Sequence, residues 1–271
     1  MTDAPGPPAA GHVGLVDVHC HVHSAEFDED RGAVLAHAAQ VGVRFVLAMG
    51  EGHADNERVL AAARAHPLVL PCLGLHPDRA SSEPLQPVLE QLRQHAPRLA
   101  AVGEVGLDFW VAQAPDQRER QRQVLSALVG LARELDLPLS VHSRSAGHHA
   151  VELLERCGAR RVCLHAFDGG ARHAARAAEL GYLLSIPPSV ARSPQKQKLV
   201  RRLPLEALML ETDAPVLGPD RAARNVPANV TLVAAAIAEL KGCTPQHVVE
   251  ATSANAWRLF GLERFAGASA R

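Results

Sequence analysis

The sequence has little of several features that would assign it to a specialised class of protein. Aromatic residues make up only 3% of its 271 residues, and its five cysteines are scattered without a Cys-x-x-Cys pair. Its apolar runs end well short of the roughly 20 residues that a membrane-spanning helix requires. The N-terminal stretch MTDAPGPPAAGHVG lacks the basic and apolar regions of a secretory signal. We therefore expect reduced thiols, an intracellular location and no contact with a membrane.

An excess of charge of one sign is also missing, since the net charge is −1. Proteins that clamp long stretches of DNA usually have a basic face. Any recognition of phosphate groups must therefore depend on a few local residues. Hydrophobic residues make up 47% of the chain, which is enough for a large buried core and argues against a disordered chain. We expect the protein to act as a monomer.

Short apolar segments alternate with longer amphipathic ones along the chain. Eight segments rich in Val, Leu and Ile are typical of buried strands, and the stretches between them have helical periodicity. The last helix is expected from Thr244 to Leu259, with a threonine cap and a proline at its first position. Eight such units predict an α/β protein with a single (β/α)8 barrel. The barrel is expected over residues 14–262, after a disordered lead at 1–13 and before a tail at 263–271.

Polar side chains stand where the predicted strands end. They are Asp17, His19 and His21 after the first strand, His76 after the third, Glu104 and Asp108 after the fourth, His142 and Arg144 after the fifth, His165 and Asp168 after the sixth, and Glu211 and Asp213 after the eighth. The C-terminal ends of barrel strands meet at one face, where barrel enzymes have their active sites. We expect these side chains to lie together in space.

The segment His19-Cys20-His21 is the most specific of these signals. Residues two apart in a strand point to the same side, so both imidazoles are expected to face the barrel axis while Cys20 faces away. A single buried histidine is more often a core residue than a ligand. Two at this spacing, with His142 and His165 at equivalent strand ends, predict a metal site. Cys20 is predicted to pack between the barrel and its helices and not to bind metal.

Other residues near these strand ends allow two interpretations. Trp110 follows Asp108, and it either stacks on a nucleobase or packs at the rim of the barrel. Lys196, Lys198 and Arg224 follow the last two strands. They either supply the positive charge that the net balance lacks or are exposed loop residues.

Five segments together resemble the signature of the TatD family of metal-dependent deoxyribonucleases. They are D-V-H-C-H (17–21), G-E-V-G-L-D (103–108), V-H-S-R (141–144), L-H-A-F-D-G (164–169) and L-E-T-D-A-P (210–215). The segments HSRSAG, SIPPS and QKQKLV resemble the branch called TatD domain-containing protein 3 in animals. The resemblance implies a (β/α)8 barrel that cleaves DNA as a 3′-to-5′ exonuclease, with incision at abasic sites as a further activity.

The resemblance also implies a binuclear centre of divalent metals. It places His19, His21, Glu104 and Asp213 on the first metal, and Glu104, His142 and His165 on the second. The identity of the metals stays open between Zn, Mn and Mg, although four histidines favour Zn or Mn over Mg.

The residue types fit hydrolysis of a phosphodiester. Glu104 is the natural bridge because a carboxylate has two oxygens, and Asp213 is expected to accept a proton from the attacking water. Arg144, two residues beyond His142 on the same side of the strand, is expected to bind a phosphate oxygen through its forked guanidinium. His76 and Arg224 are expected to assist it. The expected substrates are DNA ends or damaged DNA, held by weak local contacts.

Two positions depart from the pattern of the family. Val216 stands where many relatives have Tyr, and Val226 stands in a segment where a Glu is common between Asn and Pro. Both are expected in the substrate-facing loop after the last strand, so they bear on substrate preference.

An amidohydrolase or lactonase that acts on a small molecule with the same metals is the alternative, and a small phosphate ester is a further possible substrate. A binding protein without catalysis would be expected to lack a ligand, and all six are present.

Overall fold

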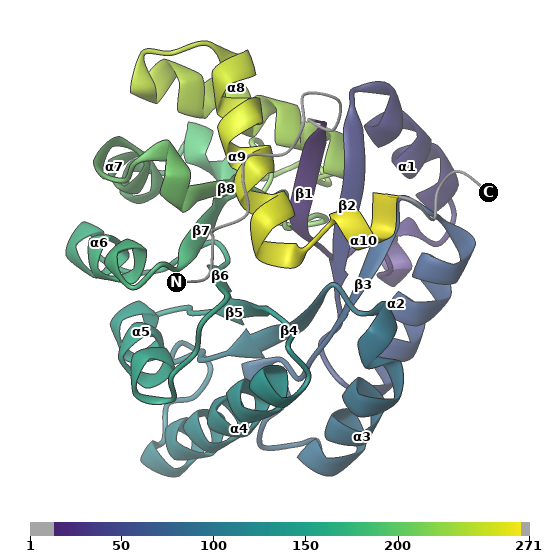
Figure 1. Cartoon of the computed structure of the whole chain (residues 1–271), viewed down its shortest axis with the longest axis vertical. Coiled ribbons are helices and arrows are strands. Elements are labelled where there is room, and N and C mark those ends of the chain that lie inside the picture. The colour runs from purple at the N-terminus through teal and green to yellow at the C-terminus, as the bar shows by residue number, and fades with distance from the viewer. Residues whose placement is uncertain (1–13, 267–271) are drawn as a thin grey trace, which may run out of the picture.

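Eight parallel strands form a barrel in the computed structural model, which describes residues 14–266 (Figure 1). The strands lie in chain order around one sheet. They are β1 (Leu15–Cys20), β2 (Val43–Met49), β3 (Val69–Leu73), β4 (Ala101–Gly106), β5 (Leu139–His142), β6 (Val162–Leu164), β7 (Leu183–Ile186) and β8 (Leu208–Leu210). After β8 the chain returns to β1, where the N–H of Asp213 donates to the carbonyl of His19 at 2.8 Å. The prediction of a (β/α)8 barrel is confirmed.

Helices surround the sheet on its outer side (Figure 1). They are α1 (Arg31–Gln40), α2 (His53–Ala65), α3 (Leu85–His95), α4 (Pro115–Glu134), α5 (Gly147–Arg156), α6 (Ala171–Glu179), α7 (Pro194–Arg202), α8 (Val230–Lys241), α9 (Pro245–Phe260) and α10 (Glu263–Ala266). Helix α9 begins as predicted, because the Thr244 side chain accepts a hydrogen bond from the N–H of His247 at 3.2 Å and Pro245 opens the helix. The expected lead at 1–13 and most of the expected tail lie outside the described residues.

The buried apolar residues form two layers, one inside the barrel and one between the strands and the surrounding helices. The inner layer contains Val16, Leu70 and Cys163 from early positions of their strands, together with Trp257 and Phe260 of α9. Helix α9 therefore covers the end of the barrel where the strands begin (Figure 1). The outer layer packs the strands against the surrounding helices. The opposite end, where the strands stop, is left for the polar side chains.

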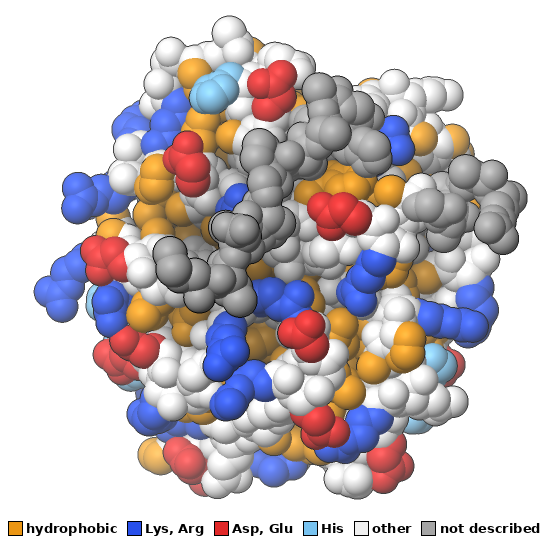
Figure 2. All heavy atoms as spheres, viewed as in Figure 1, with side chains coloured by type: hydrophobic (Ala, Val, Ile, Leu, Met, Phe, Trp, Pro, Cys, Tyr) orange, Lys and Arg blue, Asp and Glu red, His pale blue; other side chains and the backbone are white. Residues whose placement is uncertain are grey.

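Charges are mixed on the face that α9 and α10 cover. Figure 2 shows acidic and basic side chains interspersed over this face, which agrees with a net charge of −1. Among the described residues, no helix combines the length and the apolar character that crossing a membrane requires.

Cys20 belongs to the outer apolar layer and is fully buried there. Strand β1 does not alternate regularly up to this point, because its register with β2 shifts between Asp17 and Cys20. The thiol nevertheless points away from the barrel axis, with its Sγ 3.7 Å from the carbonyl oxygen of Ala214. Burial raises the pKa of the Cys20 thiol well above its usual range, so the group stays protonated.

Replacement of Cys20 tests whether its side chain points away from the polar residues at the mouth of the barrel. We expect Cys20→Ala to lower the free energy of unfolding by about 1 kcal/mol, as for a small loss of buried volume. Bound metal should be unchanged, because the thiol does not face the polar mouth. Urea unfolding and metal analysis of the purified variant measure both effects, with Cys243→Ala at a less buried thiol as the control. Loss of metal from Cys20→Ala alone would show that the thiol is a ligand.

Candidate metal centre

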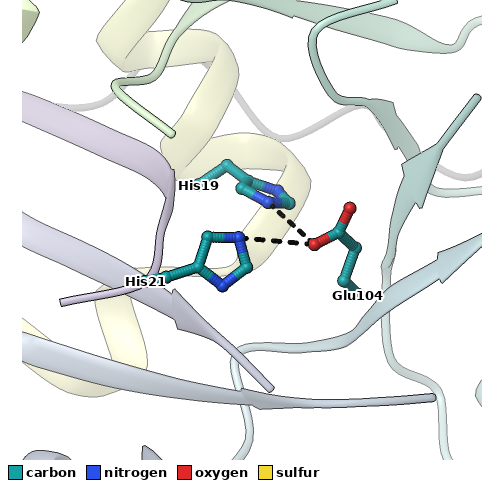
Figure 3. A group of neighbouring side chains, drawn as sticks. All are labelled: His19, His21 and Glu104. Carbon is teal, nitrogen blue, oxygen red and sulfur yellow. Dashed lines mark ion pairs between the residues drawn. The ribbon is translucent and has the colours of Figure 1, made fainter. Parts of the chain in front are cut away.

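Glu104 lies at the centre of a polar cluster at the mouth of the barrel. The residue is only 2% exposed, and its Oε2 lies 3.4 Å from Nε2 of both His19 and His21 (Figure 3). Oδ1 of Asp213 approaches the same two nitrogens, at 3.6 and 3.4 Å. Two imidazoles and two carboxylates thus face one point in space. We call these four residues the first group.

A second set of imidazoles faces the other oxygen of the same carboxylate. Oε1 of Glu104 lies 2.9 Å from Nδ1 of His142 and 3.1 Å from Nε2 of His165. Nε2 of His76 is 3.4 Å from this oxygen. We call these three histidines the second group. Each oxygen of Glu104 thus faces one group. Within these groups, two trios of donors lie close enough together to hold a metal ion: His19, His21 and Glu104, and His76, Glu104 and His142.

Four of the five imidazoles are held by a hydrogen bond at the other ring nitrogen. These bonds join His19 Nδ1 to the Ser140 hydroxyl at 3.0 Å, His21 Nδ1 to the Met49 carbonyl at 3.0 Å, His76 Nδ1 to Asp78 at 2.6 Å and His142 Nε2 to Asp108 at 3.2 Å. Nδ1 of His165 instead lies 3.5 Å from a carboxylate oxygen of Glu211 without a hydrogen bond between them. Histidines that bind metals in proteins are almost always oriented by such a partner on the second nitrogen. The nitrogens that face Glu104 are therefore fixed in direction.

The cluster fits a divalent cation on two further grounds. Nε2 of His19 is buried and has no hydrogen-bond partner among the described residues. A buried polar atom of this kind costs about 1–3 kcal/mol, and a metal ion would satisfy it. Burial alone would raise the pKa of Glu104, but the charges of His76, His165 and His19 hold it well below its usual range. The bridging group is thus a carboxylate.

Asp213 is held in its place by the chain around it. Its backbone has a φ of +54°, in the left-handed region that is uncommon for residues other than glycine. Directly before it, the N–H of Thr212 donates to Asp17 at 2.8 Å, and the Thr212 hydroxyl donates to the same carboxylate. Asp17 is fully buried, and burial raises its pKa to about 8. The hydrogen bonds between Asp17 and Thr212 therefore connect β1 with the loop after β8.

Glu211 has a part that the sequence did not reveal. The residue is fully buried, contacts His165, and accepts hydrogen bonds from the Ser185 hydroxyl and from the N–H of Ala166 at 2.9 Å. Ala166 has a φ of +38°, and its carbonyl accepts a hydrogen bond from the Lys196 ammonium at 2.9 Å. Glu211 and Lys196 thus both hydrogen-bond the backbone of Ala166 and stabilise the turn that follows His165. The sequence placed Glu211 at the end of the eighth strand and in the segment L-E-T-D-A-P, but it indicated no role for the residue.

A cavity of about 320 Å³ opens over the cluster. Its lining includes His21, His76, Glu104, His142, His165, Asp213 and Val216. Val216 is 54% exposed at this mouth, as expected for a position that meets substrate. Val226 is placed differently, because its side chain packs partly against the core of the protein. Both valines lie in the loop after β8, as expected, but only Val216 lines the cavity.

The two arginines expected to bind phosphate lie at the rim. Strand β5 ends at His142, so Arg144 lies in the following turn and not on the strand. Its guanidinium carbon lies 5.0 Å from the centre of the Trp110 ring. The guanidinium of Arg224 donates two hydrogen bonds to Asp30 and one to a backbone carbonyl. The structure does not bring Arg224 into the cluster, because an acidic side chain already holds it.

Comparison with known proteins agrees with this geometry. A family model described as TatD related DNase matches residues 16–261. The human protein named deoxyribonuclease TATDN3 is 45% identical over 264 residues, which cover 93% of this chain and 96% of the human protein. Its mouse counterpart, named a putative deoxyribonuclease, is 44% identical over 92% of this chain and 88% of its own.

A solved structure gives the same result. The crystal structure of the TatD homologue YjjV from Escherichia coli has a TM-score of 0.85 and 30% identity, and covers 91% of this chain and 98% of the homologue. In sequence comparison YjjV, named an uncharacterized metal-dependent hydrolase, is 31% identical over 256 residues. The resemblance found in the five sequence segments is confirmed. The chain belongs to the TatD family of metal-dependent hydrolases, the TatD related DNases.

Proposed function

We propose that the protein hydrolyses phosphodiester bonds of DNA with two divalent metals, one on each side of Glu104. The observation that carries this proposal is the pair of histidine groups, each facing a different oxygen of one buried carboxylate. We also propose that the protein acts as a monomer. The name of the human relative, a deoxyribonuclease, supports DNA as the substrate.

The ligands that we propose come from the two groups, except that His76 of the second group is left to contact the substrate. The first metal would be held by His19, His21, Glu104 and Asp213, and the second by Glu104, His142 and His165. Metals held there would lower the pKa of a water molecule and offset negative charge on the scissile phosphate. A donor set rich in imidazole favours Zn or Mn over Mg.

Asp213 is the proposed acceptor of the proton from the attacking water. Burial would raise the pKa of this carboxyl, but its hydrogen bond with His21 and the charges of His165 and His19 keep it below the usual value. The group is therefore ionised, as the acceptor of a proton must be. His76 lines the cavity, and Arg144 lies just beyond it in the turn after His142. We propose that these two cations bind the phosphate, with Arg224 further out along the rim.

The shape of the mouth favours a strand end or a single displaced nucleotide. A cavity of about 320 Å³ is at the small end of the range for ligand pockets. A long duplex would need a broad basic surface, whereas this chain has a net charge of −1. We therefore propose removal of nucleotides from single-stranded 3′ ends, with incision at abasic sites as a second activity.

The bridge itself gives the first prediction. We expect Glu104→Ala to lose most of its bound metal and all hydrolysis, because both groups lose their shared ligand. The fold should persist, since Glu104 is not part of either apolar layer. Metal analysis and circular dichroism measure the two effects on the same sample. A folded variant that keeps full metal content and activity would contradict the binuclear assignment.

A second prediction concerns the carboxylate behind His165. We expect Glu211→Gln to weaken metal binding about 10- to 100-fold, as is usual when the group that orients a ligand is changed. The glutamine keeps the size of the side chain but removes its charge, so the fold should be stable. Titration with Zn or Mn gives the affinity, and Glu206→Gln on the surface is the matched control. An affinity equal to that of the wild type would show that Glu211 does not act on the metal site.

The substrate proposal is tested with a 5′-labelled single strand. The metal-loaded protein should shorten the strand when its 3′ end is free and leave it intact when that end is blocked. EDTA should abolish the shortening, as well as any cut at an abasic site. A gel time course distinguishes a ladder of products from a single cut. If no nucleic acid is cleaved while an amide or a lactone is turned over, the protein is instead an amidohydrolase or lactonase.

A further inference from the structure

Trp110 is the most exposed large apolar side chain in the described part of the chain. It is 62% exposed, in a turn between β4 and α4. The next residue, Val111, is 49% exposed, whereas Phe109 before it is only 6% exposed. The turn thus buries one aromatic ring and presents another to solvent. An exposed indole leaves a large apolar surface in water, and tryptophan is enriched where proteins bind partners.

The turn that carries Trp110 is fixed to the polar cluster. One oxygen of Asp108 accepts hydrogen bonds from the N–H groups of Trp110 and Val111, at 2.9 and 3.0 Å. The other oxygen lies 3.2 Å from Nε2 of His142, whose Nδ1 is 2.9 Å from Glu104. A single carboxylate therefore positions both the imidazole of the second group and the exposed indole. The backbone of Trp110 is therefore held in a fixed position relative to His142.

Arginines surround this pair of aromatic rings. The guanidinium of Arg144 lies over the Trp110 ring. The backbone carbonyl of Arg144 accepts a hydrogen bond from the N–H of Phe109 at 3.0 Å. The guanidinium carbons of Arg118 and Arg122, at the start of α4, lie 4.8 and 5.3 Å from the centre of the Phe109 ring. Positive charge and an exposed aromatic ring therefore occur together at one edge of the mouth. This combination suits a nucleic acid strand, which offers phosphates and flat bases in alternation.

We propose that Trp110 is a stacking platform for an unpaired nucleobase next to the nucleotide at the metal centre. The inference rests on the proposed function and names the feature of DNA that the rim recognises. Arg144 stacks on the indole and places its charge where the neighbouring phosphate runs. Because every base has a flat face, the platform selects unpaired strands without selecting a sequence.

The chain offers a direct optical test, because it has only two tryptophans. Trp257 is 2% exposed in the inner layer, so a strand that stacks on the protein quenches the fluorescence of Trp110. The probes are a phosphorothioate oligothymidylate and a phosphorothioate abasic strand of the same length and charge, since phosphorothioate linkages resist cleavage. With metal-loaded protein we expect strong quenching by the first probe and little by the second. Trp110→Phe should abolish the quenching.

Affinity gives the second measurement. Trp110→Ala should bind oligothymidylate about five- to hundred-fold more weakly and bind the abasic strand with unchanged affinity. Trp110→Phe should recover part of the loss, because a phenyl ring still stacks. Leu232→Ala is the matched control, since it removes another exposed apolar side chain, 47% exposed on α8. Equal quenching by both probes, or unchanged affinity of Trp110→Ala for oligothymidylate, would overturn the proposal.

A cleavable strand in the same experiment separates this inference from the proposed function. If wild-type protein cleaves the strand but shows no base-dependent quenching, the platform is wrong and the nuclease assignment stands. If no strand is cleaved, the nuclease assignment fails. The quenching comparison then still decides whether the indole binds bases, because it does not depend on hydrolysis.

Discussion

The polar cluster at the mouth of the barrel depends on one buried negative charge, that of Glu104. Removing an ionised carboxylate from water costs several kcal/mol, and the cost is recovered only when opposite charges or hydrogen-bond donors surround the group. Glu104 is 2% exposed and has imidazole nitrogens on both oxygens, at 2.9–3.4 Å. Protons on those nitrogens or divalent metals between them can offset this charge. The cluster is therefore a site where metals and protons compete, as expected of a metal centre.

The barrel meets this requirement by bringing distant segments to the same end. The imidazoles and carboxylates come from β1, the turn after β3, β4, β5, the turn after β6 and the loop after β8. A layer of contacts behind them fixes their directions, with Asp108 behind His142 and Glu211 behind His165. The backbones of Ala166 and Asp213 have positive φ values, and these turns re-aim the chain as it leaves a strand. The position of each donor thus depends on packing far from it in sequence.

The sequence was sufficient for the barrel and for the residues of the cluster, because both follow from periodicity. Alternation of apolar strands with helices predicts the parallel sheet, and polar residues at strand ends predict the cluster at one face. The features that the sequence did not predict depend on local geometry that has no such period. Arg144 follows a strand that ends earlier than expected, and the guanidinium of Arg224 is held by Asp30 from a distant segment. The role of Glu211 depends on the turn at Ala166, where the backbone has a positive φ. The amino-acid sequence does not indicate this backbone conformation.

The central claim, that Glu104 lies between two metals, is tested most directly by anomalous diffraction from crystals of the protein loaded with Mn. The account predicts two anomalous peaks, one beside each oxygen of Glu104. The first should be within ligand distance of His19, His21 and Asp213, and the second within ligand distance of His142 and His165. A single peak, or two peaks that do not share Glu104, would contradict it.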